Sequence, residues 1–416
     1  MKYSHGTAPN AKKPRPFAQN LAPDFIIIGN SRAAPQPDNI MPRKRFIVPW
    51  TGSEEKPALY HCVSRVVDKR YALLQDDKEK FRSFMRMYEK FTGCRVLTYC
   101  LMCNHVHLLV EVTPWPPKPL SDEQLLQRVR AISSPMAVAI LRKELKEARE
   151  KLEAGLVQDE FIEKIHARYT YRMHDLSEFM KGVMQRFTQW FNGKHKRSGT
   201  LWEQRFKSVI VEDGLAARTM AAYIDLNPVR AGMVTDPAEY RWSGYGEAVG
   251  GGAKGDGKRA REGIIRAWMA HKGWNGDSKY WSGGGRQGNI HADYRAMLLI
   301  EGVEKFKEVS DQRTGELRLR LERKGMSKVE MDAELQRLEA GRGVAIAKRL
   351  RWRLRYLSDG AVIGQRSFVD EVFQQCRDQF GERRKDGARR MRGDAAGLTK
   401  ESGLWSMRDL GVPGDQ

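Results

Sequence analysis

The sequence predicts an α+β fold in which an antiparallel sheet is flanked by helices. Residues 59–66 alternate between apolar and other side chains with the period of a strand. Residues 76–91 carry apolar side chains at helical spacing, and residues 97–112 are typical of two short strands joined at Cys103-Asn104. A strand, a helix and a hairpin in this order form a β-α-β-β opening, which is characteristic of α+β sandwiches.

The length and the net charge of the chain limit the kinds of protein that it can be. The chain has 416 residues, so we expect two or three folded units. A formal net charge of +21 indicates a polyanionic partner, because basic surfaces that meet a phosphate backbone release counterions. Ribosomal, membrane-surface and merely very soluble basic proteins are the alternatives. No apolar run reaches the length of about eighteen residues that a membrane span needs. Five cysteines, an odd number, indicate a reducing cytoplasm without a disulfide framework.

Composition also predicts how the chain is divided. Residues 1–56 are expected to be a disordered basic extension, and residues 57–248 the main domain, with a helical insert at about 118–170. A glycine-rich linker is expected at 249–262, followed by a mainly helical basic region at 263–416. In that region residues 344–375 are a candidate helix-turn-helix that would read duplex DNA; a helical bundle with a basic face is the alternative.

The second strand of the hairpin contains two histidines two positions apart. A strand's period of two places His105 and His107 on one face, where their imidazoles could bind one metal ion. Two half-exposed histidines on an edge strand are the alternative. His61, on the first strand, could face the same site, but a buried and hydrogen-bonded histidine is its expected role.

A basic and aromatic segment follows the helix predicted at 176–191. Cations that alternate with Trp and Phe suit a groove for single-stranded nucleic acid, where rings stack on bases and cations meet phosphates. A solvated turn beside an amphipathic strand is the alternative. The candidate DNA-binding residues in this segment are Lys194, Lys196, Arg197, Trp202, Arg205 and Lys207.

A further helix is predicted from Leu215 to about Leu226. Asp213 is a suitable N-cap, and Asn227-Pro228 ends the helix. Tyr223 and Asn227 are four residues apart, so they lie on one side of the helix end. A tyrosine at such a position is ordinarily a core residue.

Three blocks of sequence together resemble the REP-associated tyrosine transposases. The blocks are residues 102–107, 201–208 and 223–232, and they occur in the family's order. These enzymes belong with the insertion-sequence-200-like transposases in the superfamily of His-hydrophobic-His, single-tyrosine nucleases. The resemblance covers residues 58–245. The family usually has proline where this chain has Cys103, which affects the turn rather than the chemistry.

The resemblance implies a role for particular residues. It makes His105 and His107 metal ligands and Tyr223 the nucleophile, and it makes Asn227 a third ligand or a contact to metal-bound water. Arg230, in the third block, becomes a further DNA-binding candidate. It also implies a ferredoxin-like nuclease core, whose sheet-borne histidines face the tyrosine helix, followed here by the helical basic C-terminal region.

The implied activity is cleavage and rejoining of single-stranded, hairpin or repeat DNA through a 5′-phosphotyrosine intermediate. The expected cofactor is Mg²⁺ or Mn²⁺, since both suit phosphate chemistry and imidazole ligands favour Mn²⁺. We expect a nucleoid-associated cytoplasmic monomer or homodimer without a membrane partner.

Other classes of protein compete with this interpretation. A catalytically silent, domesticated repeat-DNA-binding protein would keep the fold and lose the reaction. A zinc module would use Cys100, Cys103, His105 and His107, but strand alternation separates Cys100 from the others. A water-activating metallohydrolase would need further ligands and a general base, which the sequence does not supply.

Overall fold

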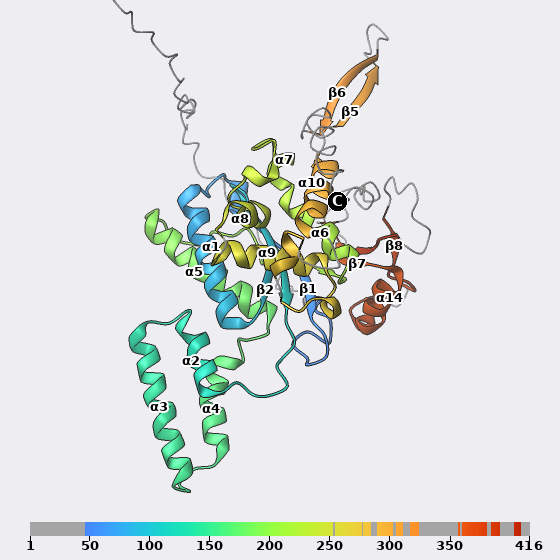
Figure 1. Ribbon diagram of the computed structural model, residues 1–416. Helices are drawn as coiled ribbons and strands as arrows, with labels where there is room; N and C mark the ends of the chain where they lie inside the picture. Colours follow the sequence, from blue (N-terminus) through green and yellow to red (C-terminus); the bar gives the residue numbers. More distant parts are fainter. Residues whose placement is uncertain are drawn as a thin grey trace, which may run out of the picture. The chain divides into compact units, whose positions relative to one another are not determined.

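A seven-stranded sheet organises the chain, and it confirms the α+β class predicted from the sequence (Figure 1). Its strands follow the order β2-β3-β1-β4-β7-β9-β8. All neighbouring strands pair antiparallel except β4 and β7, which pair in parallel. The strands are β1 (Ala58–Arg65), β2 (Arg95–Leu101), β3 (His105–Val112), β4 (Lys207–Val211), β7 (Gly360–Gly364), β8 (Arg389–Arg390) and β9 (Trp405–Arg408).

The structure is a computed structural model that describes residues 46–252, 254–276, 278–283, 289–302, 305–310, 317–323, 357, 360–380, 384–391 and 403–408. The predicted basic extension therefore lies mostly outside the described residues. Its last part, residues 46–56, is ordered rather than disordered, because Phe46, Val48 and Trp50 are buried in the hydrophobic core. No helix in the described part of the chain is long and apolar enough to cross a membrane.

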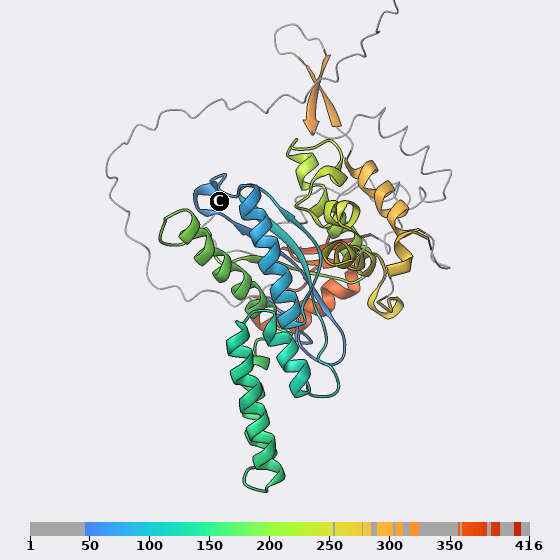
Figure 2. The same ribbon diagram turned by 60° about the vertical axis from the view of Figure 1, so that its left-hand side comes forward.

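Strand alternation gives the sheet two apolar faces, each covered by helices (Figure 2). Tyr60 and Leu108 belong to the core beneath α1 and α5, whereas Leu59 and Leu109 belong to the core beneath α6, α8 and α9. Three of these helices begin and end close to where apolar spacing predicted them: α1 (Gln75–Thr92), α5 (Leu176–Lys194) and α6 (Leu215–Asp225). The other two, α8 (Gly244–Gly250) and α9 (Asp256–Trp268), were not predicted as helices.

Helices α1 and α5 approach each other closely at Gly182. A methyl group on Gly182 would collide with the ring of Tyr88 on α1. Gly182→Ala should therefore lower the free energy of unfolding by about 1–3 kcal/mol, measured by chemical denaturation. Gly193→Ala in the same helix is the matched control, because a Cβ there meets no atom within 4 Å. Equal effects at the two positions would show that backbone propensity, not packing, sets the cost.

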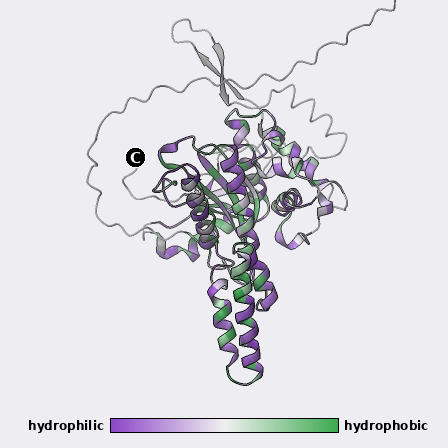
Figure 3. Ribbon diagram, turned by 90° about the vertical axis from the view of Figure 1, so that its left-hand side faces the viewer, coloured by the Kyte–Doolittle hydropathy of each residue, from purple (hydrophilic) through white to green (hydrophobic). Residues whose placement is uncertain are grey.

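The helical insert predicted at 118–170 is present as three helices. They are α2 (Asp122–Arg130), α3 (Pro135–Glu153) and α4 (Asp159–Thr170). The first two helices are separate because Ser134 caps a new helix and Pro135 occupies its first turn. These helices pack on one another through buried apolar residues such as Leu125, Leu141 and Ile162, although Met136, Ile140 and Phe161 on the same helices are exposed. Figure 3 shows hydrophobic and hydrophilic residues interspersed along them.

The glycine-rich stretch is not the linker that the sequence predicted. Helix α8 ends at Gly250 and α9 begins at Asp256, and the two helices pack against each other. A Cβ on Gly251 would lie 2.7 Å from the Cα of Gly257. The glycines therefore allow two backbones to approach closely, which composition alone does not distinguish from flexibility.

The C-terminal region also differs from the prediction of a mainly helical unit. It adds β7, β8 and β9 to the main sheet, and a strand occupies 360–364, inside the segment predicted to be a helix-turn-helix. The first predicted helix, 344–356, lies outside the described residues. Parallel pairing with β4 requires the chain to return from far along the sequence, which no local pattern reveals. The remaining elements are α7 (Asn227–Arg230), α10 (Ile290–Gly302), β5 (Lys305–Ser310), β6 (Leu317–Arg323) and α14 (Arg366–Gln375).

Candidate active site

The register of β1 and β3 gathers three histidines on one face of the sheet. Arg65 pairs with His105, Val63 with His107, and His61 with Leu109. Paired residues of neighbouring strands point to the same face, so all three imidazoles lie on the side that α6 covers. His61 and His107 are buried, and His105 is partly exposed.

Helix α6 brings Tyr223 to these histidines. The ring centroid of Tyr223 lies 5.9 Å from that of His107 and 5.9 Å from that of His61, in edge-on contacts. The rings of His105 and His107 are 4.9 Å apart. The structure therefore brings together His105, His107 and Tyr223, three of the four chemical residues singled out in the sequence.

Buried hydrogen bonds fix the end of α6 that carries Tyr223. The carboxylate of Asp225 accepts from the hydroxyls of Thr98 and Tyr294 and from the backbone N–H of Tyr245. Burial raises the pKa of Asp225 to about 7. Asp213, expected as the N-cap of this helix, instead accepts from Arg266 and from the backbone N–H of His271, and Gly214 occupies the N-cap. Asp213 does not act as the N-cap because it bonds to Arg266, which comes from the distant helix α9.

The hydrogen bonds of His105 and His107 favour metal binding through their Nε2 atoms. His105 Nδ1 lies 2.6 Å from Asn104 Oδ1, and His107 Nδ1 lies 2.9 Å from His61 Nε2. Burial lowers the pKa of His105 to about 4 and that of His107 well below its usual range, so both rings are neutral at pH 7. A neutral ring that donates through Nδ1 carries its lone pair on Nε2, so the two residues fit a divalent metal.

The described residues contain no group of three or more His, Cys, Asp or Glu side chains arranged to hold a metal. His61 does not complete such a group, because its Nε2 is bonded to His107. Two imidazoles alone leave coordination positions open, as phosphate chemistry requires.

Asn227 lies at the end of α6, where it caps the helix. Its amide nitrogen donates to the carbonyl oxygens of Tyr223 at 3.0 Å and Ile224 at 3.1 Å. The side-chain oxygen is thus the atom that could bind a metal or metal-bound water.

Arg230, one of the predicted DNA-binding residues, belongs to this site. Its guanidinium lies 5.1 Å from the ring centroid of Tyr223 and donates to the Tyr223 carbonyl at 2.9 Å. A separation of seven residues is about two helical turns, and α7 follows α6 with only Leu226, itself helical, between them, so Arg230 lies on the same side as Tyr223.

Several predicted DNA-binding side chains have partners within the fold. Lys194 forms an ion pair with Asp77 at 2.9 Å, and Arg197 donates to the Thr200 carbonyl. The indole of Trp202 donates to Thr188 and packs between Phe81 and Phe187. Its ring is therefore not an open stacking surface. Lys196 is exposed, on a backbone with φ of +48°.

Two cations lie on the same face of the sheet as the histidines. Lys207 on β4 pairs with Val63, which pairs on its other side with His107, so Lys207 lies two strands from that histidine on the same face. Arg65 pairs with His105 and contributes to lowering its pKa. Both are exposed, as is Arg205 just before β4. Sequence reasoning missed Arg65, although its even spacing from His61 on one strand indicates the shared face.

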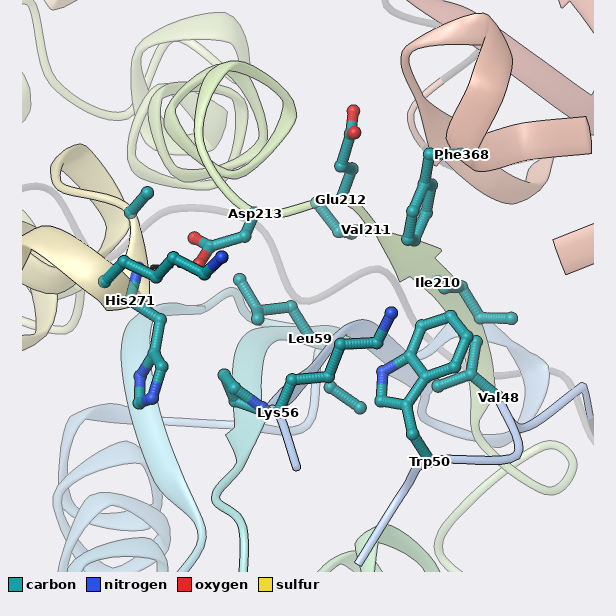
Figure 4. Close-up of a pocket in the computed structure, with 14 residues that line it drawn as sticks. Val48, Trp50, Lys56, Leu59, Ile210, Val211, Glu212, Asp213, His271 and Phe368 are labelled. Carbon is teal, nitrogen blue, oxygen red and sulfur yellow. Dashed lines mark hydrogen bonds between the residues drawn. The ribbon is translucent and has the colours of Figure 1, made fainter. Parts of the chain in front are cut away.

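A separate cavity of about 320 Å³ lies where the N-terminal segment, the end of β4 and α14 meet (Figure 4). Trp50, Leu59 and Phe368 form much of its apolar wall, and the ammonium of Lys56 lies 3.9 Å from the Trp50 ring centroid. It contains none of the residues His105, His107 and Tyr223.

One family model matches part of this chain. Residues 56–161 match the model described as "Transposase IS200 like". This segment is therefore similar to IS200-like transposases. The matched segment contains His105 and His107, whereas Tyr223 lies beyond it.

The chain matches no curated protein. It is similar to a solved structure of a REP-associated tyrosine transposase bound to a REP hairpin, with 14% identity and a TM-score of 0.31. That match covers 59% of this chain and 96% of the other.

The buried His61 is expected to make the stability of the protein sensitive to acid. Burial lowers the pKa of His61 from 6.5 to about 4, so between these values the unfolded chain binds a proton there and the folded chain does not. Stability from this group is therefore lost as pH falls from 6.5 to 4, by about 3 kcal/mol. Urea unfolding should show a shallower acid loss in His61→Gln than in the wild type. Parallel pH profiles would contradict this.

Proposed function

We propose that this protein is a metal-dependent endonuclease and strand transferase that acts on single-stranded hairpin or repeat DNA. The observation that carries the proposal is that the ring of His107 lies against both His105 and Tyr223, while hydrogen bonds at Nδ1 leave Nε2 of both histidines for a metal. The match of residues 56–161 to IS200-like transposases and the strongly basic composition support it. DNA transposition is the biological process to which this reaction belongs.

The reaction requires a covalent intermediate, because DNA can be rejoined only if the energy of the broken bond is kept. The phenolic oxygen of Tyr223 attacks phosphorus while the bond from phosphorus to the 3′-oxygen breaks. The phenol loses its proton and the departing 3′-oxygen gains one, which leaves a 5′-phosphotyrosine and a free 3′-hydroxyl. Rejoining is the reverse step with another 3′-hydroxyl.

The surrounding residues have separate roles. His105 and His107 would hold Mg²⁺ or Mn²⁺, with Asn227 as a third contact. When bound, the ion would polarise the scissile phosphate and neutralise its developing charge. Arg230 holds the Tyr223 backbone and adds positive charge beside its ring. Arg65 and Lys207 lie on the same face of the sheet as the histidines and would bind the phosphates on either side.

The direct test uses labelled single-stranded hairpin DNA from the regions flanking the gene. The purified protein is incubated with this DNA with and without Mn²⁺, then analysed by denaturing gel and mass spectrometry. A metal-dependent adduct on Tyr223 is the expected result. Binding without any adduct, across several hairpins and both metals, would favour the second candidate, a domesticated repeat-DNA-binding protein.

The cations beside the histidines should contribute to DNA affinity. Replacing Arg65 and Lys207 together with glutamine should weaken binding of a single-stranded oligonucleotide and reduce the slope of log K against log salt by about 1.4, from about 0.7 for each phosphate contact. Fluorescence anisotropy at several salt concentrations measures this. Lys143→Gln with Lys146→Gln on α3 is the matched control of equal charge. An equal change of slope in both variants would mean that only net charge matters.

A further inference from the structure

A row of hydrogen bonds connects the C-terminal region to the candidate metal site. The backbone carbonyl of Leu357 lies 3.1 Å from His61 Nδ1, and His61 Nε2 lies 2.9 Å from His107 Nδ1. All three residues are buried, with exposed fractions of 1%, 0% and 4% respectively. The imidazole rings are stacked, with centroids 5.1 Å apart and planes 13° from parallel.

The Leu357 carbonyl is the only one of these three groups whose hydrogen-bonding role is fixed, and it sets the direction of both bonds. A carbonyl oxygen can only accept, so His61 Nδ1 carries the proton that bonds to Leu357. In a neutral ring this leaves the lone pair of His61 on Nε2, which must accept from His107. His107 therefore carries its proton on Nδ1 and its lone pair on Nε2. The Leu357 carbonyl thus determines, through one intervening ring, which nitrogen of His107 can bind a metal.

Burial makes this determination strict. Both rings are buried, in a part of the protein where an added charge would be poorly solvated. A doubly protonated ring at either position would also place two N–H groups against each other or leave one buried donor unsatisfied. The neutral arrangement with all protons directed toward Leu357 satisfies every group in the row.

We propose that His61 is a positioning residue that holds His107 in its metal-binding tautomer, and that the C-terminal region completes the site by supplying the Leu357 carbonyl. The inference rests on the proposed function only in taking His107 as a metal ligand. Hydrogen bonds of this kind to the second nitrogen of a ligand histidine orient the ring and increase metal affinity. The C-terminal region is then part of the catalytic assembly, although the matched family segment ends at residue 161.

The tautomer can be measured without metal or DNA. Full-length protein with ¹⁵N-labelled histidine is compared by long-range ¹H–¹⁵N NMR with His61→Phe, His61→Gln and His174→Phe. We expect His107 to carry its proton on Nδ1 in the wild type. His61→Phe removes the acceptor, so His107 should then adopt both neutral tautomers. In His61→Gln the side-chain oxygen can still accept, so His107 should keep its proton on Nδ1. His174 is a buried histidine bonded to Thr113, so His174→Phe controls for lost core packing.

Mn²⁺ affinity gives a second readout. Isothermal titration should show a Kd at least about tenfold weaker in His61→Phe, and within about threefold of the wild type in His61→Gln and His174→Phe. A proton on Nε2 of wild-type His107 would overturn the inference, even if His61→Phe failed to fold. An unchanged tautomer and Kd in folded His61→Phe would also overturn it. Absence of Mn²⁺ binding in the wild type would instead refute the metal site, and the tautomer comparison would still decide the role of His61.

Discussion

Tyr223→Phe is expected to eliminate the covalent protein–DNA adduct while leaving DNA binding within about twofold of the wild type. Only the phenolic oxygen can form the bond to phosphorus, so its removal prevents the chemical step. The ring contact with Arg230 does not need the hydroxyl, and both Arg230 and Asn227 bond to the backbone carbonyl at this position. Denaturing gels with labelled hairpin DNA measure the adduct, and anisotropy measures binding.

A matched tyrosine controls for attack by another phenol. Tyr171 is 65% exposed and follows α4, in the helical insert, so Tyr171→Phe should retain the full adduct yield. An adduct that persists in Tyr223→Phe would assign the nucleophile to another residue. A loss of binding together with the adduct would indicate a role for the hydroxyl in holding DNA.

We expect a second large effect, on metal-dependent cleavage, when the candidate metal ligands His105 and His107 are both removed. His105→Ala with His107→Ala should abolish Mn²⁺-stimulated cleavage and heat release on Mn²⁺ titration. Metal neutralisation of a reacting phosphate contributes several kcal/mol, so the loss of rate should be on the order of a thousandfold or more.

The control for this variant is a histidine that is bonded within the helical insert. His166 on α4 bonds to Asp122 at 2.7 Å, and His166→Ala should leave both cleavage and Mn²⁺ binding unchanged. Cleavage that remains fully stimulated by Mn²⁺ in the double variant would place the metal elsewhere. Circular dichroism of both variants separates loss of the ion from loss of the fold.

Local sequence patterns were sufficient for the first half of the fold. The strand, helix and hairpin at 58–112 lie within a few residues of their predicted limits, because period-two and period-3.6 apolar spacing reflects contacts with one core. The same patterns failed at the glycine-rich stretch and at 360–364. In both places a distant partner, not local propensity, decides the structure: α8 packs on α9, and β4 pairs with β7.

The candidate site also has some features that local sequence patterns predict and others that only distant contacts decide. Spacing along one strand placed His105 and His107 on one face, and the helix end at Asn227-Pro228 placed Tyr223 beside Asn227. These relations depend on residues that are close in sequence. Which cations reach the site was not predictable, because Lys194 is neutralised by Asp77 from α1 while strand register places Lys207 on the same face as His107.

By itself, the sequence determined an α+β chain with a histidine pair on one strand, a tyrosine on one helix and a large excess of positive charge. Only the tertiary structure decided that His61 receives its tautomer from Leu357, 296 residues away, and that the C-terminal strands extend the main sheet. The physical reason is that periodicity records which side of an element is buried. It carries no information about which distant group supplies the hydrogen bond or the neighbouring strand on that side.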